Sequence, residues 1–233
     1  MIKRYKRFLA DIRCKNGDVI TIHCPNTGKM TSCAEPGFTV YYSRSDNPAR
    51  KYPHTWELAQ DDRKNFIGIN SAKANTLVKE AINAARIESL CHYERLQTEV
   101  RYGSENSRID ILLTAANKVD CYVEVKSVTL LDESRGAGYG FFPDAVSDRG
   151  AKHLRELGEM KRQGHRAVLI FCVQHTGIQS VRIAEHIDPS YMAEIKSAFN
   201  EGVEILAYTC DMTANQNCLA LPIEVCLEGM SEC

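Results

Sequence analysis

Two acidic residues and one lysine lie in two apolar, strand-like segments and form a set that could do chemistry. Asp110 is in residues 107–113, and Glu124 and Lys126 are in residues 122–128. Side chains alternate along a strand, so Glu124 and Lys126 share a face, and Asp110 lies beside them if the two strands pair as a hairpin. Adjacent carboxylates repel unless a cation lies between them, and their oxygens suit Mg²⁺ or Mn²⁺. With a lysine to stabilise phosphate or orient water, the set predicts metal-assisted phosphodiester hydrolysis.

The motif of an acidic residue, any residue and then lysine is weakly specific. With 30 acidic residues and 13 lysines among 233 residues, chance gives about one or two matches. The chain has four, which begin at Asp62, Glu124, Glu159 and Glu194. Only Glu124 lies in an apolar strand-like run that follows a second such run carrying an aspartate. The alternative is an ordinary same-face ion pair between Glu124 and Lys126, and the pattern alone leaves both interpretations open.

The elements around this set predict a mixed α/β sheet domain over residues 71–233. A helix capped by Asn70 or Ser71 should run to about Leu90 with one apolar face. Later in the chain, Asp188 should cap a helix with Pro189 in its first position and Gly202 just past its end. The order is α-β-β-β-α-β-α-β, with strands at 98–102, 108–113, 121–128, 167–173 and finally 203–208, and the two later helices at about 148–160 and 189–200.

The first 70 residues have an all-β pattern, unlike residues 71–233, and predict a small β-barrel that resembles an OB fold. Strands are expected at 3–13, 18–24, 37–43 and 65–69, separated by turn signals. Asn16-Gly17 is a hairpin signal between the first two of these strands. The sole tryptophan, Trp56, is expected in the barrel core. The predicted fold class is therefore α+β with two domains, an OB-like barrel over residues 1–70 and the α/β domain over residues 71–233.

Charge separates the same two regions. Residues 1–80 carry 14 Lys and Arg against 8 Asp and Glu, a net charge of +6, whereas residues 81–233 carry 15 against 22, a net charge of -7. A basic first region favours a polyanionic partner, although a merely solvated basic surface is an equal alternative. The residues expected to contact nucleic acid are Lys3, Arg4, Lys6, Arg7, Lys29, Arg50, Lys51, Arg108 and Arg149.

Composition limits the classes of protein that remain. Hydrophobic residues make up 44% and charged residues 25%, which is typical of globular proteins and excludes disordered and collagen-like chains. The longest apolar run, 167–173, is too short for a membrane-spanning helix. The basic N-terminal residues are not followed by a long apolar stretch, and the ten cysteines include no CxxC pair. We therefore expect a cytoplasmic protein with reduced thiols, no membrane partner and no zinc site.

Asp110 and Glu124-x-Lys126 within α-β-β-β-α-β resemble the PD-(D/E)xK nuclease superfamily. That resemblance implies a magnesium ion held by Asp110 and Glu124. Many members add a glutamate from the preceding helix, and Glu80 is the best match, with Glu88 as runner-up. The alternative for Glu80 is a solvated carboxylate near Lys79. The catalytic set implied is thus Asp110, Glu124, Lys126 and Glu80, with Mg²⁺ or Mn²⁺ as the cofactor.

Six longer stretches resemble the sugar fermentation stimulation protein A family of bacteria and archaea over nearly the whole chain. The resemblance implies an OB-like N-terminal domain, a nuclease-like C-terminal domain and DNA binding, and the family name suggests a regulatory role. The matching stretches are residues 4–11, 23–30, 51–58, 107–110, 123–130 and 142–157.

Three hypotheses about function follow. The first is a Mg²⁺-dependent nuclease whose barrel holds DNA, or RNA. The second is a non-enzymatic DNA-binding regulator of sugar metabolism genes that retains the nuclease fold. The third is a metal-dependent phosphoesterase acting on small nucleotides. Arg149 and His153 lie on one helix face and could reach a phosphate near the metal, but a lone histidine is more often structural. A homodimer is compatible with the first hypothesis, and nothing in the sequence decides it.

Overall fold

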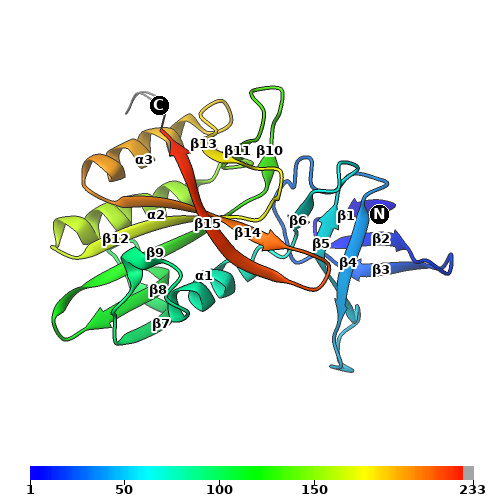
Figure 1. Cartoon of the computed structure of the whole chain (residues 1–233), viewed down its shortest axis with the longest axis horizontal. Coiled ribbons are helices and arrows are strands. Elements are labelled where there is room, and N and C mark those ends of the chain that lie inside the picture. The colour runs from blue at the N-terminus through cyan, green and yellow to red at the C-terminus, as the bar shows by residue number, and fades with distance from the viewer. Residues whose placement is uncertain (228–233) are drawn as a thin grey trace.

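The computed structural model describes residues 1–227 and begins with a six-stranded sheet (Figure 1). The strands follow the order β1-β2-β3-β5-β4, and β6 pairs with β5. Its core contains Trp56, which is fully buried and donates its indole N–H to the Leu58 carbonyl at 2.9 Å. The strands are β1 (Lys3–Tyr5), β2 (Leu9–Arg13), β3 (Val19–His23), β4 (Thr39–Arg44), β5 (His54–Gln60) and β6 (Phe66–Gly68).

The barrel departs from the sequence-based expectation in two places. Residues 3–13 form a hairpin instead of one strand, because Lys6 and Arg7 adopt positive φ values of 49° and 63° and turn the chain between β1 and β2. Strand β5 was not predicted, since its polar residues interrupt the apolar pattern. The Asn16-Gly17 hairpin between β2 and β3 is confirmed, with Gly17 at a φ of 93° that favours glycine.

The second sheet has nine strands in the order β10-β11-β13-β15-β14-β12-β9-β8-β7. Strands β7, β8 and β9 form an antiparallel meander, and β9 then pairs in parallel with β12, which pairs in parallel with β14. The strands are β7 (Arg95–Tyr102), β8 (Ser107–Ala115), β9 (Lys118–Val128), β10 (Leu130–Leu131), β11 (Tyr139–Phe142), β12 (Arg166–Val173), β13 (Ser180–Ile183), β14 (Glu204–Met212) and β15 (Asn217–Cys226).

Helices cover both faces of this sheet (Figure 1). Helix α1 (Lys73–Asn83) covers one face, where it contacts β15, β9 and β8 and shares an apolar core with Val168, Ile170 and Cys172 of β12. Helices α2 (Asp148–Arg162) and α3 (Pro189–Asn200) pack on the other face, against the alternate β12 residues. The apolar run of β12 is therefore buried on both sides, as expected for a central parallel strand. The eight predicted elements occur in the predicted order, α1-β7-β8-β9-α2-β12-α3-β14, but the prediction missed β10 and β11 before α2, β13 before α3 and β15 after β14.

Three details of the second sheet correct the sequence-based expectation. Helix α1 ends at Asn83 and is followed by a 3₁₀ turn, η1 (Glu88–Leu90), because the chain leaves the helical region at Ala85, where φ is 54°. Its N-cap is Ala72 and no side chain caps it, so neither Asn70 nor Ser71 has the predicted role. The strand ending at Met212 is not the last, because β15 returns antiparallel to it. By contrast, Asp188 caps α3 with Pro189 in the first turn, as predicted.

Main-chain contacts join the barrel to the second sheet. Gly68 N–H at the end of β6 donates to the Gln174 carbonyl at 2.8 Å, and Ile67 forms a β-bridge with His175. A side chain at Gly68 would meet Gln174 at less than 3 Å, so this close approach requires glycine. On the other side of the junction, Met30 N–H donates to the Asp144 carboxylate at 3.3 Å. The two sheets are thus hydrogen-bonded directly to one another.

Among the helices of residues 1–227, none is long and apolar enough to cross a membrane.

Asp188 links α2 to α3, and its loss should destabilise the second sheet domain. Its buried carboxylate accepts from Tyr191 N–H at 3.0 Å and from Ser147 N–H, the α2 cap residue, at 2.9 Å. We expect Asp188→Ala to lower the free energy of unfolding by about 2–3 kcal/mol, because both donors become unsatisfied. Urea denaturation followed by circular dichroism measures this change. Asp211→Ala, at an exposed position on β14, is the matched control, and an equal effect in both variants would contradict the linking role.

Candidate active site

Asp110 and Glu124 lie where strands β8 and β9 separate. The antiparallel pairing runs through Leu112 with Tyr122 and ends at Ile111 with Val123. One further step would place Asp110 opposite Glu124. Instead, Val125 N–H donates to Asp110 Oδ2 at 2.8 Å. A side-chain carboxylate therefore takes the place of a backbone acceptor at the point where the ladder opens.

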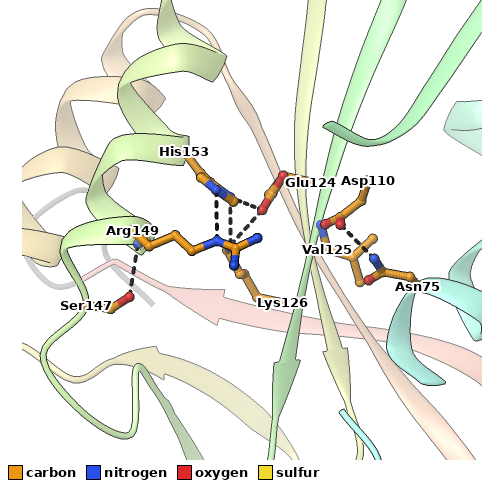
Figure 2. A network of polar contacts seen from close by, with 9 residues as sticks. Asn75, Asp110, Glu124, Val125, Lys126, Ser147, Arg149 and His153 are labelled. Carbon is orange, nitrogen blue, oxygen red and sulfur yellow. Dashed lines mark hydrogen bonds and ion pairs between the residues drawn. The ribbon is translucent and has the colours of Figure 1, made fainter. Parts of the chain in front are cut away.

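The direction of β8 changes at Asp110. Ile109 packs in the core beneath α2 and α3, whereas Ile111, two residues on, packs in the core beneath α1. Residues two apart on a regular strand face the same side, so the alternation is broken at Asp110. The Asp110 side chain reaches α1, where Asn75 Nδ2 donates to Asp110 Oδ1 at 2.6 Å (Figure 2). Both carboxylate oxygens of Asp110 thus have a fixed donor.

Glu124 is held on the opposite side of β9, facing α2 (Figure 2). Its side chain is 2% exposed, and Lys126 Nζ donates to Glu124 Oε1 at 2.6 Å. His153 Nδ1 of α2 contacts the same oxygen and lies 3.2 Å from Lys126 Nζ. Arg149 Nε lies 3.4 Å from His153 Nε2. The predicted shared face of Glu124 and Lys126 is confirmed, and α2 supplies two further polar residues.

The two carboxyl groups differ in their pKa. Burial and the negative charge of Glu124 together raise the pKa of Asp110 to about 6, although the Val125 N–H, Lys126 and Asn75 oppose this shift. Burial also favours the neutral form of Glu124, but the Lys126 ammonium and the His153 hydrogen bond outweigh it and lower the pKa of Glu124. In the absence of an added cation, Glu124 is therefore the carboxylate and Asp110 is the group that readily takes up a proton.

A divalent cation fits this arrangement because buried oxygen atoms near Glu124 have no hydrogen-bond partner. Glu124 Oε2 makes no hydrogen bond, and nearby Tyr102, whose pKa is raised by burial and by both carboxyl groups, has an unpartnered hydroxyl. Glu156 Oε2 on α2 is unpartnered as well. Carboxylate and neutral oxygen donors suit Mg²⁺ or Mn²⁺. Within residues 1–227, however, no three His, Cys, Asp or Glu side chains come together as a ready-made ligand cluster.

Glu80 does not join the two carboxylates. It is exposed on α1 and lines a cleft of about 320 Å³ with Glu57 of the barrel and Lys73. Five residues separate it from Asn75, which is a rotation of about 140° around the helix. Asn75 is therefore the α1 residue that reaches Asp110, and the expectation of a third ligand at Glu80 is corrected. Glu88, in the 3₁₀ turn after α1, is also exposed.

The predicted nucleic-acid-binding residues fall into three groups. The first group is exposed on the barrel and consists of Lys6, Arg7, Lys29 and Lys51. Lys3 is exposed as well, but its Nζ lies 3.8 Å from Asp11 Oδ2. Two others are turned to structural partners: Arg4 donates to the carbonyls of Asn26 and Gly28, and Arg50 donates to Thr55. On the second sheet domain, Arg108 is exposed two residues before Asp110, and Arg149 is exposed beside His153.

Sequence reasoning omitted Asn75 from the site and weighed His153 without including it. Asn75 lies on α1 between the buried residues Ala74 and Leu77, and a polar residue at such a position is a signal for a buried hydrogen bond. Tyr102 and Glu156 gave no signal, because only the folded arrangement brings them near Glu124.

Two family models match almost all of the chain. The SfsA N-terminal OB domain matches residues 2–69, and the sugar fermentation stimulation protein RE domain matches residues 72–216. The fold class expected from the sequence, an OB-like barrel followed by a mixed α/β domain of the nuclease-like type, agrees with these matches and with the observed topology.

Similar proteins carry the same family name. The sugar fermentation stimulation protein homolog of Aeromonas salmonicida (strain A449) is 59% identical over 208 residues, which cover 89% of this chain and 84% of that protein. The homolog of Shewanella loihica is 58% identical over 213 residues, which cover 91% and 89%. The structure of Pyrococcus furiosus SfsA in complex with Ca²⁺ matches with a TM-score of 0.83 at 24% identity, over 96% of this chain and 93% of that one. The chain therefore belongs to the sugar fermentation stimulation protein family.

Proposed function

We propose that this protein is a DNA-binding nuclease that depends on a divalent cation, Mg²⁺ or Mn²⁺. The observation that carries the proposal is the buried, unpartnered Glu124 Oε2 beside Asp110, at the point where β8 and β9 separate. Two carboxyl groups so close together, one of them with a raised pKa, form a site that gains from an added cation.

Asp110 and Glu124 would hold the cation, and Tyr102 would face it. When bound, such an ion polarises a phosphodiester and lowers the pKa of a bound water. Lys126 holds Glu124 in the metal-free protein and carries an ammonium that can donate to a phosphate oxygen. Arg108 is exposed two residues before Asp110, and Arg149 is exposed beside His153, which contacts Glu124. Both guanidinium groups are suited to contact flanking phosphates.

The barrel is proposed to bind the nucleic acid. Its exposed lysines and arginines provide phosphate contacts that do not depend on sequence, and the OB fold is a common platform for oligonucleotides. DNA is the proposed substrate, with RNA as an outcome of the test. In support of a divalent ion, the related P. furiosus protein was determined in complex with Ca²⁺.

The same proposal includes the organisation and location of the protein. Residues 1–70 form the nucleic-acid-binding unit and residues 71–233 the nuclease unit. A cytoplasmic location is part of the proposal and rests on the sequence-based expectation of reduced thiols.

Removal of Lys126 or of the Asp110 charge should slow cleavage strongly. We expect wild type to cut one or more members of a DNA and RNA panel in Mg²⁺ or Mn²⁺ but not in EDTA. Lys126→Ala and Asp110→Asn should each lower the rate by about 10²-fold or more, the size seen when a preorganised charged group is lost. Glu80→Gln is the matched control and should retain the wild-type rate, because Glu80 lies in the cleft that it lines with Glu57 and Lys73.

The absence of cleavage in wild type, with tight and salt-sensitive DNA binding retained in both variants, would overturn the nuclease proposal. It would favour the alternative, a non-enzymatic DNA-binding regulator. Metal-dependent hydrolysis of small nucleotides without polymer binding would favour the phosphoesterase.

Neutralising the β1–β2 turn should weaken DNA binding through its electrostatic component. For the double variant Lys6→Ala with Arg7→Ala, we expect the slope of log K against log salt to decrease in magnitude by about 1.5, since each lost phosphate contact removes about 0.7–0.9. Fluorescence anisotropy with labelled DNA at several salt concentrations measures the slope. Lys118→Ala, at an exposed position on β9, should leave it unchanged. An unchanged slope in the double variant would remove this turn from the proposed interface.

Asp110 should make the metal-free protein less stable as pH rises. Its pKa is raised in the folded state to about 6, so the stabilisation is complete below its ordinary pKa and is lost as pH rises through 6. Relative to Asp110→Asn, wild type should therefore lose on the order of 1–2 kcal/mol of unfolding free energy between pH 5 and pH 7.5 in EDTA. Urea denaturation of both proteins at the two pH values measures this. A pH-independent difference would contradict the raised pKa.

A further inference from the structure

Helix α2 places two further side chains, Arg149 and His153, beside Glu124 (Figure 2). Neither was among the acidic residues and the lysine of the predicted catalytic set. Arg149 and His153 are four residues apart, so both face the sheet. His153 is 5% exposed and lies between the other two residues, with Nε2 toward Arg149 Nε and Nδ1 toward Glu124 Oε1. The three side chains are thus in successive contact, from the exposed Arg149 through His153 to the buried Glu124 carboxylate.

The two partners of His153 determine which ring nitrogen bears the proton, because the Glu124 carboxylate only accepts and the Arg149 guanidinium only donates. A guanidinium group is always protonated in proteins and has only donors. Nε2 of His153, which lies 3.4 Å from Arg149 Nε, must therefore accept a hydrogen bond. A neutral imidazole has one donor and one acceptor, so the proton is on Nδ1 and is donated to Glu124 Oε1.

Lys126 completes the arrangement without competing for that proton. Its ammonium has no acceptor capacity, and Nδ1–H has no free lone pair, so the 3.2 Å approach between them is not a hydrogen bond. Lys126 instead donates to Glu124 Oε1 at 2.6 Å. Two donors therefore converge on Oε1, whereas Oε2 of the same carboxylate is buried and has none.

We infer that His153 is a positioning residue: its Nε2 is held by Arg149, and its Nδ1–H fixes Oε1 of Glu124 so that Oε2 is the oxygen offered to the cation. The inference rests on the proposed function for the identity of the ligand, but the tautomer follows from the contacts of the metal-free protein. Fixing one oxygen orients the other, which is the usual role of the hydrogen-bonded shell around a metal ligand.

Helix α2 is suited to hold such a pair. Its first turn is capped by Ser147 Oγ, which accepts from Gly150 N–H at 3.0 Å, and Ser147 N–H is bound by the buried Asp188. Arg149 lies within that capped turn, and His153 lies in the turn that follows. The backbone that carries both residues is therefore anchored independently of Glu124.

The tautomer is the first test and needs neither cation nor substrate. In protein with ¹⁵N-labelled histidine, long-range proton–nitrogen correlation spectra identify the protonated ring nitrogen of each of the seven histidines. The signal absent from His153→Asn belongs to His153. We expect the ring to be protonated at Nδ1 in wild type and also in Arg149→Ala, because the Glu124 carboxylate still accepts from that nitrogen. A ring protonated at Nε2 alone in wild type would overturn the inference.

Cation binding is the second test. Isothermal titration of the full chain with Mn²⁺ alone should show an affinity about 10–100-fold weaker in His153→Ala than in wild type, the usual effect of losing a hydrogen bond to a ligand. His153→Asn, whose amide N–H can replace Nδ1–H, should recover most of this loss. Lys152→Ala, which removes a cation from the same helix, should match wild type.

The results separate the inference from the proposed function. Failure of wild type to bind Mn²⁺ would overturn the proposed metal site. The proton–nitrogen correlation spectra would still identify the tautomer of His153. If wild type binds Mn²⁺ and His153→Ala binds it equally well, the positioning role is wrong and the metal site stands. If both His153→Ala and His153→Asn bind Mn²⁺ more weakly than wild type by the same factor, with circular dichroism unchanged, the role assigned to Nδ1–H is also overturned.

Discussion

The burial of the Glu124 carboxylate is the constraint on which the rest of the site depends. A buried ion is costly unless it is paired and hydrogen-bonded. Lys126, two residues further along the same strand, supplies the charge, and His153 supplies a directed donor from α2. Helix α2 must therefore lie against this part of β9, and the apolar contacts of α2 with β12 and α3 hold it there.

The position of Asp110 on the other side of β9 reduces its repulsion with Glu124. If β8 and β9 paired regularly beyond Ile111, Asp110 would lie directly across from Glu124 with both carboxylates on one face. The change of face at Asp110 turns its side chain toward α1 instead, where Asn75 and the Val125 N–H hold it. The two carboxyl groups remain close enough for the charge of Glu124 to raise the pKa of Asp110, yet each has its own donors and its own helix.

Much of this arrangement could be predicted from local patterns. Strand alternation placed Glu124 and Lys126 on one face, and Asp188 and Pro189 marked the start of α3. The α1 residue of the site could not be found in this way. Its spacing from Asp110 does not tell which side of α1 faces the sheet, and the structure turns Asn75 inward and Glu80 away. The short strands β10, β11 and β13 and the polar strand β15 were also missed. Their pairing depends on partners distant in the sequence, and they show little periodicity of their own.

The hydrogen bonds between β6 and residues 174–176 have a consequence for how the barrel and the second domain work together. Because Gly68 N–H binds the Gln174 carbonyl directly after β12, the barrel is joined to the sheet by main-chain contacts as well as by the covalent connection. The Met30–Asp144 contact adds a second point of attachment on a different loop. Two separated attachments resist rotation better than one. The basic turn of the barrel and the acidic pair on β8 and β9 are therefore held at a preset spacing, and a polymer long enough to reach both must meet that spacing by its own length and curvature.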